Sequence, residues 1–382
     1  MGFIEKRPDR QGRPWRARYR APGGREHSKS FARKVDAERW LTEREREKNR
    51  GQWLDPALGK VTVGEWSVRY LRTKQHLKPY TLAGYQSLLR NQILPAFDDV
   101  PLNAIQPIEV REWVAELQAG GLSASRTRQA YHLLRALLRY AVESGYLVRN
   151  PADGVDLPRL PRREMHFLSA EKLQWLSEAT RPPYSTLIVL LGYGGLRWGE
   201  AVALRRSRCH LLRSRVEVAE SLAEVNGRRY FGEPKTYQRR MVAVPAFLQN
   251  RLAAHLASEV EDDPGALVFT SPTGKPIRHG WFYARVWKPA LEEACLPEDV
   301  RIHDLRHTAA SLLIAEGVHP RAVQAHLGHS SISVTMDRYG HLFPSEFEAI
   351  AEKLEAVHKR AAAQARPSKA RVVPLAGKTA SE

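Results

Sequence analysis

Residues 301–308 read RIHDLRHT, and this short stretch places three side chains suited to phosphate chemistry close together. On a helix, His303, Arg306 and His307 share one face, because they are spaced three and four residues apart. A histidine that transfers a proton beside an arginine that neutralises phosphate charge is a usable catalytic pair. The two histidines also have a zinc-ligand spacing, but no glutamate follows the first of them and no third ligand is evident. A structural histidine is the other alternative.

Residues 192–200, which read GYGGLRWGE, form a second candidate phosphate site upstream. The apolar run at 186–191 predicts a helix that ends in the glycine turn, and a second helix then begins with Arg197 in its first turn. An arginine and the free backbone N–H groups of a helix N-terminus can bind one phosphate together. Glu200 follows three residues later, so a structural Arg–Glu pair on one helix face is the alternative.

Lys235 lies in the sequence GEPKTY at residues 232–237. Strand-like runs at 216–219 and 240–244 flank this segment, so the sequence predicts that Lys235 lies at the tip of a hairpin. A lysine in an isolated turn is usually solvated, which is the alternative to a catalytic role.

Two further segments towards the C-terminus hold candidate site residues. The sequence HLGHSS at 326–331 predicts a helix end at a glycine stop, directly before His329. The sequence TMDRYGH at 335–341 contains Tyr339, which on its own is an ordinary packing or surface tyrosine. Neither segment is specific by itself.

In their order along the chain, these segments resemble the catalytic motifs of the tyrosine recombinases, the phage integrase family. The resemblance is strong over residues 166–363. The catalytic set that it implies is Arg197, Lys235, His303, Arg306, His329 and Tyr339, with Glu200 in a supporting role. The function that it implies is a site-specific recombinase that integrates or excises phage or mobile-element DNA.

The resemblance also implies a mechanism that needs neither a metal nor another cofactor. Tyr339 attacks a DNA phosphodiester and forms a 3′-phosphotyrosine with a free 5′-hydroxyl. Arg197 and Arg306 hold the nonbridging oxygens, and Lys235 is the general acid for the departing 5′-oxygen. Of the two histidines in the set, the first assists proton transfer and the second hydrogen-bonds the scissile phosphate.

The composition also favours a DNA partner. The 382 residues include 60 Lys and Arg against 42 Asp and Glu, a net charge of +18. A basic balance of this size usually reflects a polyanionic partner, with a basic but inert surface as the alternative. No apolar run is long enough to cross a membrane, and no signal peptide is evident. The two cysteines, Cys209 and Cys295, suit a reducing compartment, so we expect a protein of the bacterial cytoplasm, associated with the nucleoid.

Residues 1–60 resemble the arm-type DNA-binding domain of the family. Strands are predicted within 3–31, because WRARYR at 15–20 alternates aromatic or small residues with arginines, and a helix is predicted over about 34–49. A basic face on such a sheet can enter a DNA groove, or its arginines can simply face water. The candidate DNA-binding residues here are Arg16, Arg18 and Arg20.

Residues 61–150 predict an all-helical region that resembles the core-binding domain of the family. Thr62 and Glu65 have the spacing of a capping box at the start of the first helix. Further helices are predicted over 81–93, 107–117 and 125–144. The candidate DNA-binding residues are Arg126 and Arg128. A solvated basic face is the alternative.

The whole chain is predicted to be a multidomain α+β protein. Its parts are a small N-terminal domain of a β-sheet plus a helix, an all-α core-binding domain, and a mixed, mainly α-helical catalytic domain with a small antiparallel sheet. The expected boundaries are 1–60, 61–150, a Pro- and Arg-rich linker at 151–165, the catalytic domain at 166–363 and a flexible basic tail at 364–382.

The resemblance implies double-stranded DNA as the partner, bound at core-type and arm-type attachment sites. Four protomers assemble on two duplexes as a homotetramer, and a host DNA-bending protein and a directionality factor are candidate partners. The segment 344–362 predicts a helix that docks on a neighbouring protomer or packs on its own chain. The alternatives to an integrase are a host chromosome-resolving recombinase, a type IB topoisomerase and a catalytically silent DNA-binding regulator.

Overall fold

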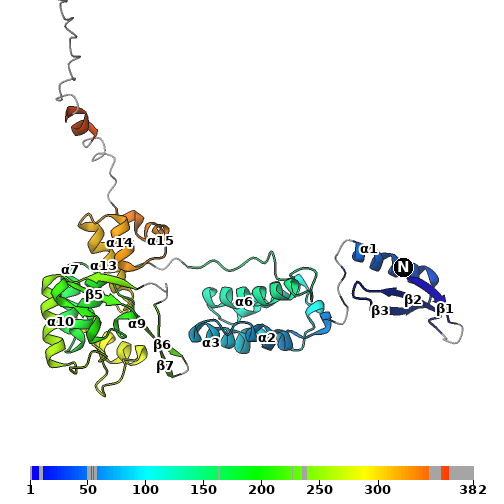
Figure 1. Cartoon of the computed structure of the whole chain (residues 1–382), viewed down its shortest axis with the longest axis horizontal. Helices are drawn as coiled ribbons and strands as arrows, with labels where there is room; N and C mark the ends of the chain where they lie inside the picture. The colour runs from blue at the N-terminus through cyan, green and yellow to red at the C-terminus, as the bar shows by residue number, and fades with distance from the viewer. Residues whose placement is uncertain are drawn as a thin grey trace, which may run out of the picture. The chain divides into compact units, whose positions relative to one another are not determined.

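The computed structural model describes residues 2–7, 12–49, 53, 55, 58–161, 164–225, 227–234, 239–343 and 354–360. The chain divides into two compact units, one of residues 1–164 with 223–230 and the other of residues 165–222 with 231–382. Helices and small antiparallel sheets make up the chain (Figure 1), so the prediction of a mixed fold with small sheets is confirmed. Within the described ranges, no helix is both long and apolar enough to cross a membrane.

A three-stranded antiparallel sheet forms the N-terminal part of the first unit. The sheet order is β1 (Phe3–Lys6), β2 (Trp15–Arg20) and β3 (Glu26–Phe31), and helix α1 (Lys34–Asn49) follows (Figure 1). Alternate residues of β2 point to opposite faces. Those on one face are buried in a core shared with α1, made of Ala17, Tyr19, Ala37 and Leu41. The arginines of β2 therefore lie on the other face, and the predicted strands and helix are confirmed.

The rest of the first unit is mainly helical. Its longer elements are α2 (Val63–Arg72), α3 (Pro79–Leu88), the π-helical turn η2 (Leu89–Ile93), α4 (Leu94–Phe97), α5 (Pro107–Ala119) and α6 (Ala124–Glu143). The Thr62 hydroxyl accepts a bond from the Glu65 amide at 3.2 Å and the Glu65 carboxylate accepts one from the Thr62 amide at 3.4 Å, so the predicted capping box is present. The helix predicted over 81–93 becomes π-helical at its end, directly before Pro95, whose missing amide hydrogen interrupts α-helical bonding.

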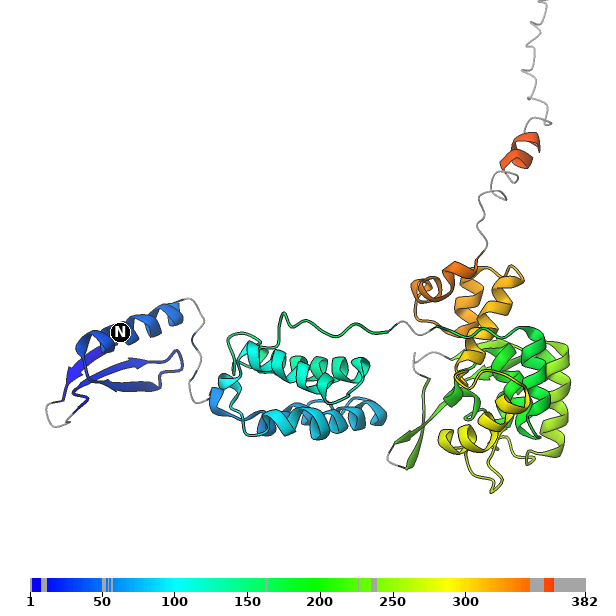
Figure 2. The ribbon, with the colours of Figure 1, turned by 180° about the vertical axis from the view of Figure 1, so that it is seen from behind.

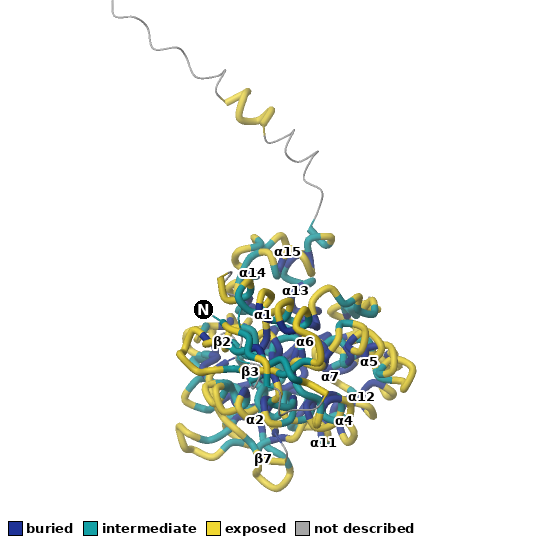
Figure 3. The backbone as a smooth tube through the Cα atoms, turned by 90° about the vertical axis from the view of Figure 1, so that its right-hand side faces the viewer, coloured by how far each residue is buried: buried dark blue, intermediate teal, exposed yellow. Residues whose placement is uncertain are grey.

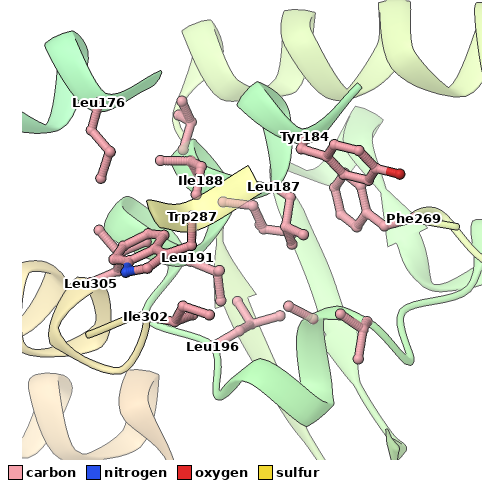
Figure 4. Close-up of a cluster of buried hydrophobic side chains, with 14 of the residues drawn as sticks. Leu176, Tyr184, Leu187, Ile188, Leu191, Leu196, Phe269, Trp287, Ile302 and Leu305 are labelled. Carbon is pink, nitrogen blue, oxygen red and sulfur yellow. The ribbon is translucent and has the colours of Figure 1, made fainter. Parts of the chain in front are cut away.

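Helix α8 (Tyr184–Gly194) lies in the main hydrophobic core of the second unit. Ile188 and Leu191 of α8 are buried there together with Trp287 and Leu305 (Figure 4). A helix that is apolar all round must be buried, which places its C-terminal end inside the fold. Other helices that contribute to this core include α7 (Ala170–Ala179), α10 (Ala246–Ser258), α11 (His279–Phe282), the π-helical turn η6 (Tyr283–Trp287), α12 (Lys288–Glu293) and α13 (Asp304–Ala315).

A three-stranded sheet completes this unit. Strand β5 (Arg215–Val218) pairs antiparallel with β8 (Arg240–Ala243) on one side and with β4 (Cys209–His210) on the other. Strands β5 and β8 match the predicted ones. The hairpin of β6 (Ser221–Val225) and β7 (Arg228–Gly232), which lies between them in the chain, was not predicted. Its sequence does not alternate apolar with polar residues, because most of β7 is exposed.

Helices α13, α14 (Pro320–Leu327) and α15 (Ile332–Tyr339) share a small core of their own (Figure 2). Helix α14 ends at Gly328, which has a φ of +68° in the left-handed region, so the predicted glycine stop is confirmed. Residues 354–360 are helical and exposed (Figure 3). A helix is predicted over 344–362, and its other residues lie outside the described ones. The predicted tail at 364–382 also lies outside them.

Candidate active site

The tight turn after α8 and the short helix that follows it carry the first two candidate site residues, Arg197 and Glu200. Gly195 has a φ of +66°, and an added Cβ would lie 2.7 Å from Cδ2 of Leu327, so glycine is required there. Arg197 is the N-cap of helix α9 (Trp198–Ala201), with φ −71° and ψ 150°, rather than a residue of the first turn as predicted. The Glu200 carboxylate reaches back to accept bonds from the Arg197 amide at 2.9 Å and from its Nη1 at 2.8 Å.

Glu200 is the buried anion of the site, with 2% of its surface exposed. Arg240, at the start of β8, donates from Nη1 and Nη2 to the two carboxylate oxygens at 3.1 and 2.7 Å. Burial alone would raise the pKa of Glu200, but the hydrogen bonds and charge of Arg240, followed by those of Arg197, lower it to about 2. Glu200 is therefore ionised at neutral pH and holds two guanidinium groups at once.

Arg240 is a site residue that the sequence did not indicate. Its Nε donates to the carbonyl oxygen of His326 at 3.0 Å, and a Cβ added to Gly328 would lie 2.7 Å from its Cδ. Arg240 thus links β8, α9 and the end of α14. No local pattern relates Arg240 to Glu200, since 40 residues separate them and an arginine at the start of a strand is common in a basic chain.

Arg306 is almost fully buried, with 2% of its surface exposed. Its Nη1 and Nη2 donate to the carbonyl oxygens of Gly195 and Leu327, at 2.6 Å each. Burial, followed by the charge of Arg197, lowers the pKa of Arg306 to about 9, so it remains a cation at neutral pH. Neutral carbonyls orient the guanidinium without cancelling its charge, and the positive potential favours an anion beside it.

Tyr339 ends α15 and is fully buried. Its hydroxyl oxygen lies 2.7 Å from Nδ1 of His307, and its ring stacks on the ring of His329 with centroids 6.2 Å apart. Burial raises the pKa of Tyr339, while the charge of Arg306 acts in the opposite direction. The phenol is therefore protonated at neutral pH, and the positive charge of the buried Arg306 guanidinium acts on it.

The two histidines of the predicted set are neutral. The Nδ1 of His329 lies 2.9 Å from Oγ1 of Thr335, whereas its buried Nε2 has no hydrogen-bond partner among the described residues. Burial, followed by the charge of Arg306, lowers the pKa of His329 to about 3. His303 is the N-cap of α13 and keeps part of its ring exposed. Desolvation of the rest of the ring, followed by Arg306, lowers the pKa of His303 to about 4.

The turn after α14 brings the arginines and His329 together. Arg197 donates from Nη2 to the carbonyl oxygen of Gly328 at 3.3 Å, and Arg306 donates to that of Leu327, two residues before His329. The residues of the predicted set that the structure places around this turn are Arg197, Glu200, His303, Arg306, His329 and Tyr339. Lys235 lies outside the described residues.

The candidate DNA-binding arginines make contacts within the chain. Arg18 pairs with Glu5 at 2.7 Å and with Glu26 at 3.2 Å, which reduces the charge that it offers to DNA. Arg20 is exposed at the end of β2. Further contacts include those of Arg16 with the Ser28 hydroxyl, of Arg126 with the Ser87 hydroxyl and of Arg128 with the Pro158 carbonyl.

The zinc alternative rests on His303 and His307. In the part of the chain that the structure describes, no group of three or more His, Cys, Asp or Glu side chains is arranged to hold a metal ion. His307 bonds the phenol of Tyr339, and its ring meets that of His303 edge-on with centroids 4.9 Å apart.

Arg240→Gln should lower the free energy of unfolding by about 3 kcal/mol, because removing one partner of a buried ion pair leaves the other charge poorly compensated. Urea unfolding measures this loss. The control is the double variant Glu200→Gln with Arg240→Gln, which removes both charges and should be less destabilised than the sum of the two single variants. Strict additivity would mean that the two side chains do not stabilise each other.

The pKa of Glu200 predicts how this stabilisation depends on pH. Its pKa in the folded chain, about 2, lies below the ordinary value of 4.5. The stabilisation from its ionised form is therefore complete above the unfolded value and is lost as the pH falls towards the folded one. We expect the stability difference between the natural chain and Glu200→Gln to shrink as urea unfolding is repeated at pH values below the ordinary value. A difference that stays constant would contradict the lowered pKa.

Comparisons with known proteins show what the chain is similar to. A model described as "Phage integrase family" matches residues 166–346, one described as "Phage integrase, N-terminal SAM-like domain" matches 62–118, and one described as "Phage integrase, N-terminal domain" matches 2–50. Among solved structures, the integrase of transposon Tn1549 has a TM-score of 0.67 at 21% identity, over 78% of this chain and 100% of that one. A lambda integrase structure has a TM-score of 0.57 at 17% identity, over 88% of this chain and 93% of the other.

Two curated relatives come from mycobacteria and their phages. The integrase of Mycobacterium phage D29 is 26% identical over 345 residues, 85% of this chain and 88% of the relative. A protein named as a prophage phiRv2 integrase of Mycobacterium tuberculosis is 31% identical over 340 residues, 86% of this chain and 88% of the relative. With that identity over most of both sequences, and with family models matched in all three regions, the chain belongs to the phage integrase family of site-specific tyrosine recombinases.

Proposed function

We propose that Tyr339 is the nucleophile of this recombinase. Its phenol attacks a DNA phosphodiester, forms a 3′-phosphotyrosyl ester and releases a 5′-hydroxyl. The observation that carries the proposal is the position of the phenol, 2.7 Å from a histidine nitrogen and in one cluster with Arg306 and His329. The ester retains the energy of the broken phosphodiester, so rejoining needs no further energy source.

Two arginines bind the nonbridging oxygens of the scissile phosphate in this proposal. Arg197 and Arg306 are oriented before DNA arrives, the first by Glu200 and the second by backbone carbonyls. Oriented donors stabilise the charge that develops in the transition state without the cost of reorganising. In this proposal Nδ1 of His329 accepts a hydrogen bond from the Thr335 hydroxyl, so that the ring proton is on Nε2, which donates a hydrogen bond to a phosphate oxygen. His303, whose ring is partly exposed, assists proton transfer.

Lys235 is the general acid that protonates the departing 5′-oxygen. A nicked suicide substrate tests this role together with the overall reaction. The purified protein should form a covalent complex with it in the absence of Mg²⁺ and ATP, and Lys235→Ala should slow that step by about 10²-fold or more.

A substrate with sulfur in place of the 5′-bridging oxygen separates the role of Lys235 from a general loss of activity. A thiolate leaves without a proton, so this substrate should restore the rate of Lys235→Ala but not that of Arg197→Ala. If Lys235→Ala were equally slow on both substrates, Lys235 would not be the general acid. If the natural chain formed no covalent complex at all, the proposed function would be wrong.

The proposed partner is double-stranded DNA. The Tn1549 integrase was solved with transposon right-end DNA, and lambda integrase was solved as a dimer on a core site and as a tetramer on a Holliday junction. For this chain, we propose that four protomers act on two duplexes, with a host DNA-bending protein and a directionality factor as further partners. Residues 354–360 would belong to a helix that docks on a neighbouring protomer.

The proposed domain layout assigns DNA contacts to the first 150 residues. Separate hydrophobic cores support it, since the core of β2 with α1 is distinct from that of α2–α6 and from that of the second unit. Residues 1–60 would bind arm-type sites and 61–150 core-type sites, joined by a linker at 151–165 to a catalytic domain at 166–363. The proposed DNA contacts are Arg16, Arg18, Arg20, Arg126 and Arg128.

A further inference from the structure

The phenol of Tyr339 has a hydrogen-bond partner that the proposed catalytic set does not use. Nδ1 of His307 lies 2.7 Å from the Tyr339 hydroxyl oxygen, and both side chains are buried, with 5% and 0% of their surfaces exposed. His307 stands on α13, one residue after Arg306 and one helical turn after His303. It therefore contacts the very atom that must lose a proton when the ester forms.

The surroundings of His307 favour a neutral ring with a free lone pair. Burial, followed by the ring of His303, lowers the pKa of His307 to about 4. The charged groups that act on it are Asp304 and Arg301 from around the start of α13 and Arg338 from α15. The ring of Phe167 meets that of His307 edge-on, with centroids 6.4 Å apart. A neutral imidazole has one N–H and one lone pair, so Nδ1 of His307 accepts a hydrogen bond from the phenol when the ring proton is on Nε2.

We propose that His307 is a further catalytic residue of this recombinase, the base that takes the phenolic proton from Tyr339 during DNA cleavage. The inference rests on Tyr339 being the nucleophile. The two neighbouring histidines then have separate tasks: His307 takes the proton of the nucleophile, while His303, whose ring is partly exposed, assists proton transfer on the side of the phosphate.

The step balances with Lys235, the general acid of the proposed function, as the second proton carrier. As the bond between Oη of Tyr339 and phosphorus forms, the phenolic proton passes to Nδ1 of His307, which becomes an imidazolium. The bond from phosphorus to the 5′-oxygen breaks, and that oxygen takes a proton from Lys235. In rejoining, the 5′-hydroxyl attacks phosphorus and returns its proton to Lys235, while the departing phenolate recovers its proton from His307.

DNA binding would make His307 a better base. A phosphate held by Arg306 and Arg197 adds negative charge close to the imidazole, and a nearby anion raises the pKa of a histidine. A base is most effective when its pKa lies near the working pH. The low pKa in the free chain keeps His307 unprotonated before DNA arrives.

The test compares His307→Asn and His303→Asn in the full chain on the nicked suicide substrate. Asparagine can place an amide oxygen near the position of Nδ1 and accept the same hydrogen bond, but it cannot take the proton. We expect His307→Asn to cleave ~10²–10⁴-fold more slowly in single turnover, with unchanged DNA binding. Cleavage at the natural rate would overturn the proposal.

A more acidic phenol distinguishes loss of a base from loss of packing. With 3,5-difluorotyrosine incorporated at position 339, the nucleophile needs less help to lose its proton, so the rate of His307→Asn should rise selectively while that of His303→Asn should not. An unchanged defect in His307→Asn would make His307 structural. Covalent trapping of Tyr339→Phe would instead overturn the proposed nucleophile, so the two failures are distinguishable.

A measurement on the natural chain keeps the proposal testable even if the variants do not fold. In protein labelled with ¹⁵N-histidine, NMR reports which ring nitrogen of His307 carries the proton. We expect an unprotonated Nδ1 at neutral pH. A protonated Nδ1 that donates to the phenol oxygen would overturn the assignment of His307 as the base.

Discussion

Tyr339→Phe is expected to abolish the covalent protein–DNA complex and to leave DNA binding nearly intact. The substitution removes one oxygen and no charge, so contacts with the DNA backbone, which dominate affinity, persist. Without the hydroxyl, no phosphotyrosyl ester can form. Denaturing gels of a reaction with a nicked suicide substrate measure the covalent complex, and a mobility-shift assay at fixed salt measures binding.

The folded state of Tyr339→Phe needs its own control. The hydroxyl is bonded to His307, so its removal leaves a buried nitrogen without that partner, at a cost of about 1–3 kcal/mol. Circular dichroism should show a folded protein with a lower unfolding midpoint. If the folded Tyr339→Phe variant were still trapped covalently, another residue would have to be the nucleophile.

Arg197→Ala is expected to slow cleavage in single turnover by about 10²-fold or more, the loss seen when an oriented transition-state donor is removed. Arg197 lies at the N-terminus of α9, with its Nη1 held by Glu200 and its Nη2 by the Gly328 carbonyl. Its side chain is 23% exposed, so the substitution leaves only a small cavity in the core. The effect should therefore fall on the rate rather than on the fold.

Arg197→Lys is the matched control for charge. Lysine keeps the positive charge but lacks the planar fork that can bind Glu200 and a phosphate together. We expect it to retain DNA binding and to recover only part of the rate. If Arg197→Ala cleaved DNA at the natural rate, Arg197 would not stabilise the transition state.

Local signals in the sequence predicted much of the fold. The bounds predicted for α1, about 34–49, are those observed, and Gly51, the predicted stop, follows its last residue closely in the sequence. The capping box at Thr62 and the left-handed glycine at Gly328 are likewise properties of a few neighbouring residues. The membership in the integrase family is confirmed as well, since it depends on motifs that are each local in the sequence.

Contacts between distant segments could not be predicted in the same way. The buried pair of Glu200 and Arg240 joins α9 to β8, and the bond between His307 and Tyr339 spans 32 residues. Spacing within one helix indicated that His303 and His307 share a face, but not which of them meets the phenol.

The measurement that tests the central claim most directly is identification of the amino acid joined to DNA. The natural chain, trapped on a suicide substrate, is digested with trypsin and nuclease, and the peptide that carries the residual nucleotide is sequenced by mass spectrometry. We predict a nucleotide linked through its 3′-phosphate to Tyr339, in the peptide that follows Arg338. A nucleotide attached to any other side chain, or linked through a 5′-phosphate, would contradict the proposed chemistry.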